Sequence, residues 1–200
     1  MSRGSRPMKK FCLLILLAAL TCLCGCKEPE PNVLTPDEEA RGWYLLWDGE
    51  DPANGWVGVS AGCSNFTARG WSVTNGVLVA SAGADPIRTA SPYKDFDLKV
   101  DYRLAPGASG NVLYFHNAET NVDTSVAYVL SPPPPEAKDP LVWQTARIVA
   151  RRKPVTHWLD GRIVERKTRD NAELEGRIVL APGEGQVEFR NVKIRPFGKW

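Results

Sequence analysis

The sequence has few of the residues that build metal centres and disulfide frameworks. Of its 200 residues only two are histidine and five are cysteine. Four of the cysteines lie within the first 26 residues, which leaves Cys63 alone in the rest of the chain. One cysteine gives neither an internal disulfide nor a thiolate metal site, although a catalytic thiol stays open. The two histidines, His116 and His157, show no ligand spacing with the scattered acidic residues.

The chain also lacks a long hydrophobic run. The apolar stretch Phe11–Leu23 has 13 residues, whereas a transmembrane helix needs about 20. Residues 1–10 before it carry four basic side chains and no acidic one. A basic head followed by a short apolar run is typical of a secretory signal rather than of a membrane span.

The end of this apolar run, Leu23-Cys24-Gly25-Cys26, resembles the lipobox of bacterial lipoproteins. The resemblance implies cleavage before Cys26 and acylation of its sulfur and its new amino group, and several acyl chains hold a protein stably on a membrane. Ordinary signal cleavage that leaves Cys26 free is the alternative. Because Lys27 rather than Asp follows the cysteine, the resemblance favours the outer membrane, with the protein facing the periplasm or the exterior of the cell envelope.

The charge balance gives no support to nucleic acid binding. The whole chain has 25 basic and 23 acidic residues and a formal charge of +2. Loss of residues 1–25 would leave 21 basic and 23 acidic residues, a net charge of −2 over 175 residues. This balance predicts neither a nucleic acid partner nor an electrostatic membrane patch. A chain of that length is long enough for one domain with a real core.

Composition divides the remaining chain into a linker and a domain. Residues 27–41, KEPEPNVLTPDEEAR, contain three prolines and five acids and little apolar surface. We therefore expect residues 26–41 to form an acylated cysteine followed by a flexible linker. Residues 42–200 are expected to form a single domain.

Strand patterns fill this domain, and no helical period in it is longer than a turn or two. In Phe96–Leu104 the apolar and charged positions alternate strictly, which predicts one face on a core and a charged face that is solvated or paired across strands. Further strands are expected over residues 43–47, 71–80, 110–115, 143–150, 155–165, 176–180 and 186–195. Many short strands without long helices predict an all-β sandwich of two antiparallel sheets.

Turn and bulge signals set the details of these strands. Asn75-Gly76 and Asp160-Gly161 each supply the two positive φ angles of a type I′ turn, so both predict tight hairpins. The apolar parity of the last strand flips between Phe189 and Val192. A strand of period two needs an extra residue for this, which predicts a β-bulge at Arg190-Asn191, with Arg190 paired to an acid.

The hairpin at residues 155–165 carries His157 and Trp158 next to each other. Tryptophan beside polar groups is a common way to grip a sugar, and histidine is a common acid or base. A core histidine beside a core tryptophan is the alternative. Adjacent strand residues face opposite ways, so at most one of the pair can line a site. With Asp160-Gly161 as the turn, His157 is predicted to share a face with Val164, and Trp158 with Ile163.

A series of short motifs gives the chain its resemblance to one family. They are Gly42–Gly49 with Gly55-Trp56, Trp71–Leu78, Tyr93–Arg103, Ser109-Gly110, Trp143–Val149, His157–Gly161, Gly176–Leu180 and Phe189–Pro196. Each motif is weak, but the ordered set resembles the 3-keto-disaccharide hydrolase domain family. The resemblance implies a concanavalin-like jelly-roll β-sandwich with a concave face, and glycosides oxidised at C3 as substrates.

A substrate of this kind has a defined chemistry. The C3 ketone acidifies the hydrogen on C2, a base removes it, and a cation or hydrogen-bond donor stabilises the enolate oxygen. The group at C1 is then expelled and water adds. Such a site needs a base, a partner for the oxyanion and a platform for the sugar.

The resemblance also nominates residues, and the sequence departs from the family at some of them. His157 is the candidate base. Tyr114 or His116 stands where relatives carry an arginine, and both are candidate substrate-binding residues. Glu119 and Asp123 are an incomplete form of the family's E-x-Q-x-x-D motif, so they are candidate catalytic carboxylates or ordinary loop residues.

Two further residues are expected to bind substrate. Arg147 lies in the matched R-I-V segment on the opposite parity to Ile148, where it could bind a sugar oxygen or the enolate from the concave face; a solvated arginine is the alternative. Asp160 replaces the family's Asn in H-x-x-N-G.

Three functions follow from these residues. The first is a lipid-anchored hydrolase or lyase of 3-keto-glycosides, and the second is a non-catalytic carbohydrate-binding domain that has lost the carboxylates. The third is a structural or interaction domain without a glycan ligand. The expected partners are a carbohydrate and, through the lipid anchor, a membrane, with no nucleic acid. No cofactor is demanded by the residues, and a divalent cation such as calcium enters only by analogy with the family.

Overall fold

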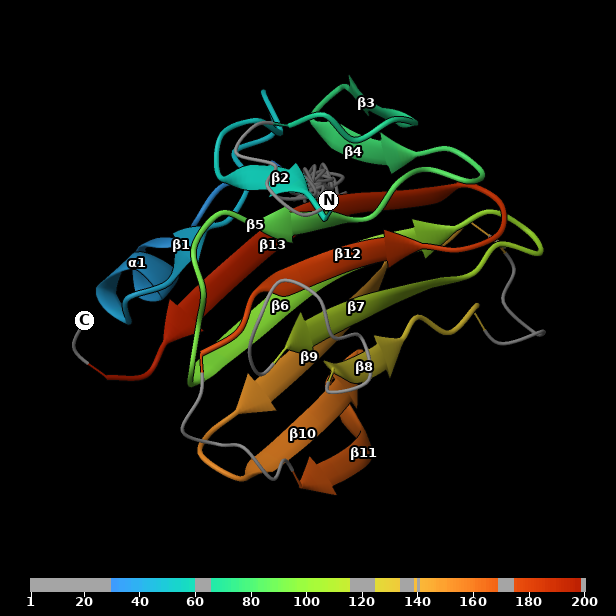
Figure 1. Ribbon diagram of the computed structural model, residues 1–200. Helices are drawn as coiled ribbons and strands as arrows, with labels where there is room; N and C mark the ends of the chain where they lie inside the picture. The colour runs from blue at the N-terminus through green and yellow to red at the C-terminus, as the bar shows by residue number, and fades with distance from the viewer. Residues whose placement is uncertain are drawn as a thin grey trace, which may run out of the picture.

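The structure is a computed structural model, and it describes residues 30–59, 66–115, 125–133, 139, 141–168 and 175–198. These residues form two antiparallel β-sheets that pack face to face (Figure 1). One short helix, α1 (Pro36–Ala40), accompanies them. Within the described ranges no helix has the length and hydrophobicity needed to cross a membrane.

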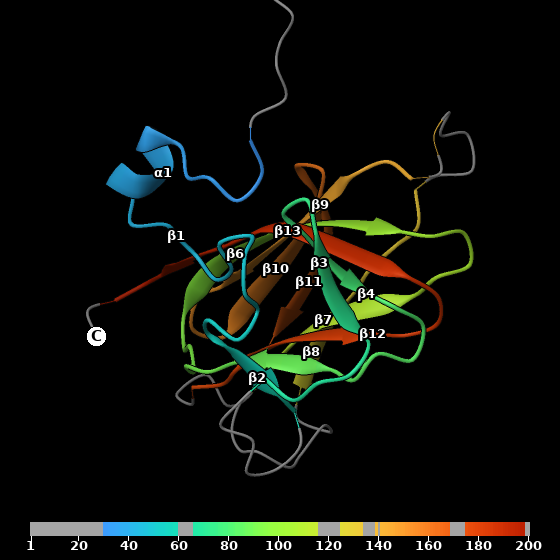
Figure 2. The same ribbon diagram turned by 90° about the horizontal axis from the view of Figure 1, so that it is seen from above.

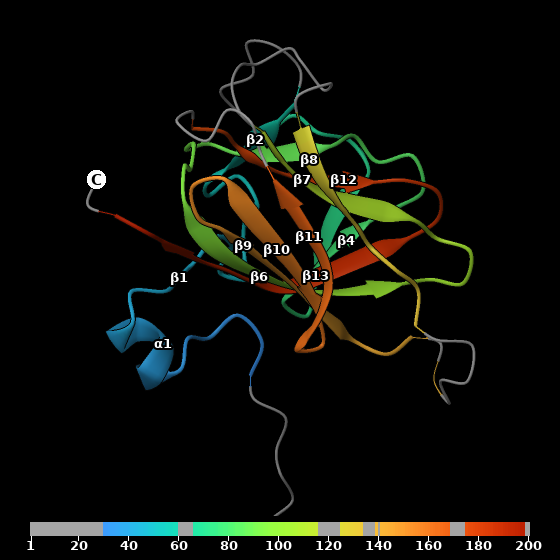
Figure 3. The ribbon, with the colours of Figure 1, turned by 90° about the horizontal axis from the view of Figure 1, so that it is seen from below.

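Sheet A, the larger sheet, has eight strands in the order β11-β10-β9-β6-β13-β4-β3, with β1 paired to β13. Its strands are β1 (Tyr44–Leu45), β3 (Trp71–Thr74), β4 (Val77–Ala80), β6 (Phe96–Leu104), β9 (Gln144–Ala150), β10 (Pro154–Leu159), β11 (Arg162–Thr168) and β13 (Val187–Pro196). Figure 2 shows sheet A above sheet B, and Figure 3 shows β9, β10 and β11 side by side at one end of sheet A.

Sheet B has five strands in the order β2-β5-β12-β7-β8. They are β2 (Trp56–Gly58), β5 (Ile87–Thr89), β7 (Gly110–Phe115), β8 (Ser125–Val129) and β12 (Ile178–Pro182). The predicted all-β sandwich is confirmed. The sequence patterns did not indicate β2, β5 and β8. β2 and β5 are three residues long and buried at every position, so they have no alternation to detect.

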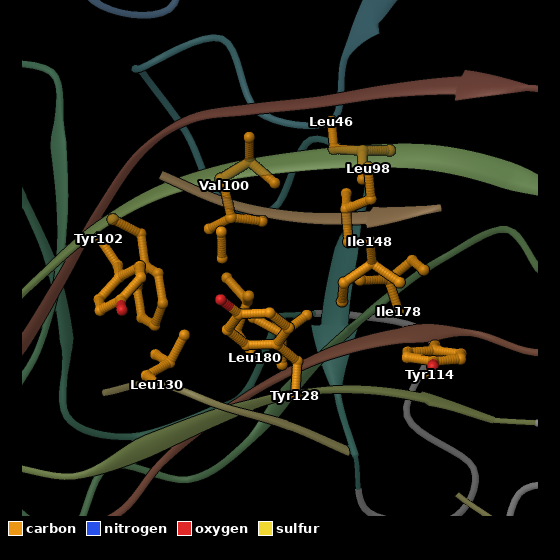
Figure 4. Packing of buried hydrophobic residues seen from close by; sticks show 14 of the residues in the cluster. Leu46, Leu98, Val100, Tyr102, Tyr114, Tyr128, Leu130, Ile148, Ile178 and Leu180 are labelled. Atoms are coloured by element: carbon orange, nitrogen blue, oxygen red, sulfur yellow. The ribbon is translucent and has the colours of Figure 1, made fainter. Parts of the chain in front are cut away.

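The core lies between the sheets and is supplied by alternate positions of each strand. In β6 the even-numbered positions from Phe96 to Leu104 are all buried. Side chains of sheet A such as Leu98 and Ile148 meet those of sheet B such as Ile178 and Leu180 (Figure 4). The predicted period of two in β6 is therefore confirmed.

Both predicted hairpin turns have the expected backbone. The φ angles are 50° and 71° at Asn75-Gly76 and 46° and 78° at Asp160-Gly161. The predicted bulge is also present, because the register of β13 against β6 shifts between Arg190 and Lys193. Asn191, at the bulge, has a φ of 51° and donates to Asp101 over 2.7 Å. Arg190 lies 3.9 Å from the same carboxylate, as the expected ion pair requires.

The segment before Gly42 differs in part from the predicted flexible linker. Thr35 and Glu38 form a capping box that begins α1. Glu38 then accepts hydrogen bonds from Lys193 over 2.9 Å and from Lys99 over 3.3 Å, so that α1 is held on the side of sheet A that faces away from sheet B (Figure 2). Lys99 and Lys193 stand directly opposite each other on β6 and β13, where like charges repel, and Glu38 offsets one of their two charges.

The electrostatics of Glu38 agree with this role. Burial alone would raise its pKa, but the hydrogen bonds from Lys193, from the Thr35 amide and from Lys99 lower the pKa to about 2. Glu38 therefore stays ionised over the whole range in which proteins are normally studied.

The bulge residue gives a first testable prediction. Asn191→Ala places alanine at a positive φ angle, where no polar side chain then offsets the strain. It also removes the hydrogen bonds to Asp101 and from the Asn32 amide. The free energy of unfolding should therefore fall by about 2 kcal/mol. Asn191→Gly removes the same side-chain bonds but keeps the backbone conformation, and should cost less. Urea denaturation measures both. If the glycine variant is the less stable one, the backbone conformation is not the main constraint.

Candidate functional site

Sheet A separates His157, the candidate base, from Arg147, the candidate substrate-binding arginine. In the register of β9 against β10, His157 is opposite Ile148 and Trp158 is opposite Arg147. His157 points between the sheets and is 1% exposed, whereas Arg147 and Trp158 lie on the outer face of sheet A. His157, the candidate base, and Arg147, the candidate substrate-binding residue, therefore cannot belong to one site, because side chains of opposite parity cannot leave the same face of a sheet.

A polar cluster surrounds His157, and we name it the His157 cluster. Its members are Tyr114, Tyr128, His157, Glu165 and Lys167. Nε2 of His157 lies 3.0 Å from the Tyr114 hydroxyl of β7, and Nδ1 lies 3.2 Å from Oε2 of Glu165 on β11. Lys167 Nζ is 3.1 Å from the same oxygen. The Tyr128 ring lies 4.9 Å from the imidazole, centre to centre. The cluster thus joins both sheets at one end of the sandwich.

Glu165 enters this cluster because β11 is irregular. The register of β10 against β11 shifts between His157 and Trp158, so Glu165 rather than Val164 stands opposite His157. Val164 is instead 54% exposed. The prediction that His157 and Val164 share a face is wrong for this reason. The sequence of β11 has no apolar alternation from which the inward turn of Glu165 and Lys167 could be detected.

Burial keeps the imidazole neutral. It lowers the pKa of His157 below its ordinary value of 6.5, and the positive charge of Lys167 lowers it further, against the opposing effect of Glu165. The hydrogen bond from Lys167 lowers the pKa of Glu165, which is therefore ionised. A neutral imidazole that donates Nδ1–H to Glu165 has a free lone pair at Nε2, and this lone pair accepts the Tyr114 hydroxyl proton.

The cluster runs from the core to the surface. Tyr114 and His157 are buried, whereas the side chain of Glu165 is 46% exposed. Lys167 also donates to the Ala127 carbonyl of β8 over 3.2 Å, which ties the edge of sheet A to sheet B. A carboxylate at the surface, oriented by a buried imidazole and flanked by an ammonium group, can accept a proton and stabilise a nearby negative charge.

The other predicted site residues have different positions. Tyr114 is in the His157 cluster and buried, so it does not meet solvent as a substrate-binding residue would. Asp160 is a turn residue whose carboxylate accepts the Thr145 amide over 2.8 Å. Residues 26, 116, 119 and 123 lie outside the described residues, so the expected roles of Cys26, His116, Glu119 and Asp123 stay predictions.

Arg147 binds within its own sheet. Its Nε and Nη2 each donate to Asp97 over 2.7 Å, and Arg195 donates to the same carboxylate over 3.0 Å. Asp97 is 0% exposed although it belongs to the outer face. The hydrogen bond to Asp97 raises the pKa of Arg147. Asp97, Asp101 and Arg103 of β6 are thus paired across strands, one of the two arrangements predicted for them, whereas Lys99 pairs with Glu38 of α1.

Over the described ranges, no three His, Cys, Asp or Glu side chains gather closely enough to hold a metal ion. The divalent cation suggested by family analogy stays a prediction.

The arrangement of the sheets defines a jelly-roll sandwich of the kind found in glycosidases and carbohydrate-binding modules. A candidate glycosyl hydrolase of Parabacteroides distasonis ATCC 8503 is 20% identical, with a TM-score of 0.70 over 84% of this chain and 100% of that one. The laminarinase catalytic domain of Thermotoga maritima MSB8 is 13% identical, with a TM-score of 0.51 over 80% of this chain and 99% of that one. The module CBM66 of Bacillus subtilis is 17% identical, with a TM-score of 0.50 over 70% and 94%.

Sequence comparison identifies the family. Residues 42–195 match the 3-keto-alpha-glucoside-1,2-lyase-like domain, and the chain belongs to this family. No curated protein sequence matches the chain. The family and the fold together support a carbohydrate-active function.

The neutral state of His157 predicts how stability depends on pH. Its pKa is lower in the folded protein than the ordinary 6.5 of the unfolded chain, so between these two values the unfolded state binds more protons. The free energy of unfolding should therefore decrease as the pH falls through 6.5 and stop responding to this group below the folded pKa. Subtracting the pH profile of His157→Gln from that of the wild type isolates the contribution. A difference that does not change with pH would contradict a neutral His157.

Proposed function

We propose that this protein cleaves the glycosidic bond of 3-keto-glycosides, such as 3-keto-disaccharides, by removing the proton next to the ketone. The observation that carries the proposal is the His157 cluster, a hydrogen-bonded chain that reaches the surface at Glu165. Membership of the 3-keto-alpha-glucoside-1,2-lyase-like family supports the substrate class.

The exposed end of the cluster supplies the reacting groups. Glu165 takes the proton from C2, and the electrons of the C–H bond form the enolate with the C3 oxygen. The ammonium group of Lys167, 3.1 Å from Glu165, stabilises that oxygen. The electrons then return, the C1–oxygen bond breaks, and the leaving oxygen takes up a proton. A lyase releases the unsaturated ketone, whereas a hydrolase adds water across its double bond.

The buried end of the cluster positions the base. His157 donates Nδ1–H to Glu165 and so fixes the direction of the carboxylate, while Tyr114 fixes the tautomer by donating to Nε2. His157 and Tyr114 are therefore positioning residues in this proposal. Glu165 takes the role of base that the sequence suggested for His157.

The enzymatic proposal is tested with a chromogenic substrate. The purified protein should release nitrophenol from a p-nitrophenyl 3-keto-α-glucoside but not from the unoxidised glucoside, because only the ketone acidifies the C2 hydrogen. Glu165→Gln should reduce kcat by about 10²- to 10⁴-fold, the usual contribution of a general base. Parallel assays with EDTA test the divalent cation expected from the family.

Two buried tyrosines give a matched control for this assay. Tyr114→Phe removes the hydroxyl on Nε2 of His157 and should shift the pH profile of kcat. Tyr128→Phe removes a hydroxyl that donates to the Trp158 carbonyl instead, although its ring packs on the same imidazole, and should leave the profile unchanged. Equal effects of the two variants, or full activity of Glu165→Gln, would contradict the assignment.

A non-catalytic carbohydrate-binding domain is the second candidate. The deep burial of Tyr114 and His157 favours it, since a wholly structural cluster would also be buried. Measurable binding of the 3-keto-glucoside without turnover would select this function over the first.

We also propose that the protein is lipid-anchored through Cys26 on the outer membrane of the cell envelope, as the lipobox-like sequence suggests. Wild-type protein should then incorporate a labelled fatty acid and fractionate with the outer membrane. Cys26→Ala should lose both the label and the membrane association, because a single acylated residue carries the anchor. A labelled protein in the membrane fraction after this substitution would refute the proposed anchor.

A further inference from the structure

The outer face of sheet A carries an unusual row of cations. Arg147 on β9, Lys99 on β6 and Lys193 on β13 are directly opposite one another in the sheet register. Trp158 on β10 continues the row beyond Arg147. Like charges at opposite positions of neighbouring strands destabilise a sheet, so a row of three requires compensation.

The compensation is incomplete. Arg195 lies beside this row and shares Asp97 with Arg147, and Glu38 binds both lysines. These contacts set two carboxylates against four cations, a local excess of two positive charges. One positive charge stays unmatched in each pair of cations: Arg147 and Arg195 share Asp97, and Lys99 and Lys193 share Glu38.

Arg147 has a donor edge left for a ligand. Its two described hydrogen bonds leave from Nε and Nη2, the edge of the guanidinium that faces Asp97. The planar group has a second edge, formed by Nη1 and Nη2, that matches a carboxylate. The side chain is 37% exposed although Asp97 beneath it is fully buried, so the guanidinium is fixed from below and reaches solvent. Such an arginine needs little reorganisation to bind an anion.

Trp158 contacts Arg147 on the same face. The guanidinium carbon lies over the Trp158 ring, 5.7 Å from its centre, so the two side chains form one aromatic and cationic surface. Its buried Nε1 atom has no hydrogen-bond partner in the part of the chain that the structure describes. The same holds for the buried Nε of Arg195. These two buried atoms do not reach solvent, so the donor for a ligand is the exposed guanidinium of Arg147. An aromatic face beside such a donor suits a pyranose ring, whose apolar face stacks while its oxygens accept hydrogen bonds.

We propose that the outer face of sheet A binds an acidic carbohydrate, with the carboxylate of a uronic acid on the outer edge of Arg147 and the sugar ring on Trp158. This site is separate from the His157 cluster, which lies on the opposite face of the same sheet. It does not depend on whether the protein cleaves 3-keto-glycosides.

The test is titration calorimetry of the purified full-length protein with oligogalacturonate. The same oligosaccharide with its carboxylates methyl-esterified is the matched ligand, since the charge is removed while the sugar rings are kept, and it should bind about tenfold more weakly. Arg147→Gln should weaken binding of the acid by about tenfold. Arg103→Gln is the matched control protein. Arg103 also pairs with a carboxylate, that of Glu188, and lies 4.7 Å from the ring of Trp143, but it is not part of the cation row. The variant should therefore bind as the wild type does.

Arg147→Gln could fail to fold because it leaves Asp97 buried with one partner fewer. The double variant Asp97→Asn with Arg147→Gln removes the buried charge as well, and Trp158→Leu removes the platform without touching Asp97. Both should weaken binding of the acid. Equal binding of acid and ester, unchanged binding in these variants, or no binding at all would overturn the proposal. Binding of phosphatidylglycerol vesicles in place of the oligogalacturonate would overturn it in favour of a lipid surface.

Discussion

The alternation of side chains along a β-strand is the constraint on which both the His157 cluster and the outer face of sheet A depend. Because successive residues of β9 and β10 leave opposite faces of sheet A, Ile148 and His157 enter the sandwich while Arg147 and Trp158 leave it. A hairpin that carries histidine and tryptophan side by side therefore cannot use both at one place. It contributes one residue to each of two separate polar arrangements, and sheet A keeps these apart.

Asp97 on the outer face of sheet A and His157 on its inner face are buried polar groups whose partners come from elsewhere in the sequence. Asp97 is satisfied by arginines on β9 and β13, and His157 by Tyr114 across the sandwich and Glu165 on the neighbouring strand. Removing one partner of a buried charge typically costs about 3–5 kcal/mol. Such groups therefore limit which substitutions the partner positions on neighbouring strands tolerate. The same fixation orients Arg147 and Glu165, the two side chains that also reach solvent.

Sequence patterns predict those parts of the structure that are set locally. The alternation in β6, the two type I′ turns and the parity flip in β13 need only a few neighbouring residues, and each is present. β2 and β5 are buried on both sides and give no alternation. The inward position of Glu165 depends on a register shift in β11, and the partnership of Glu38 with Lys193 joins residues 155 positions apart. Neither has a local signal.

The segment before the family-matched residues explains why the two ends of the outer face differ. Asn32 exchanges hydrogen bonds with Asn191 at the bulge, and Glu38 binds both Lys99 and Lys193. The polypeptide thus supplies its own anion to the β6 and β13 end of the cation row. Asp97 of β6 instead lies beneath Arg147 of β9 and Arg195 of β13, and it leaves one of their two charges unmatched. A carboxylate from outside the chain would offset that charge, as Glu38 offsets one of the two lysines.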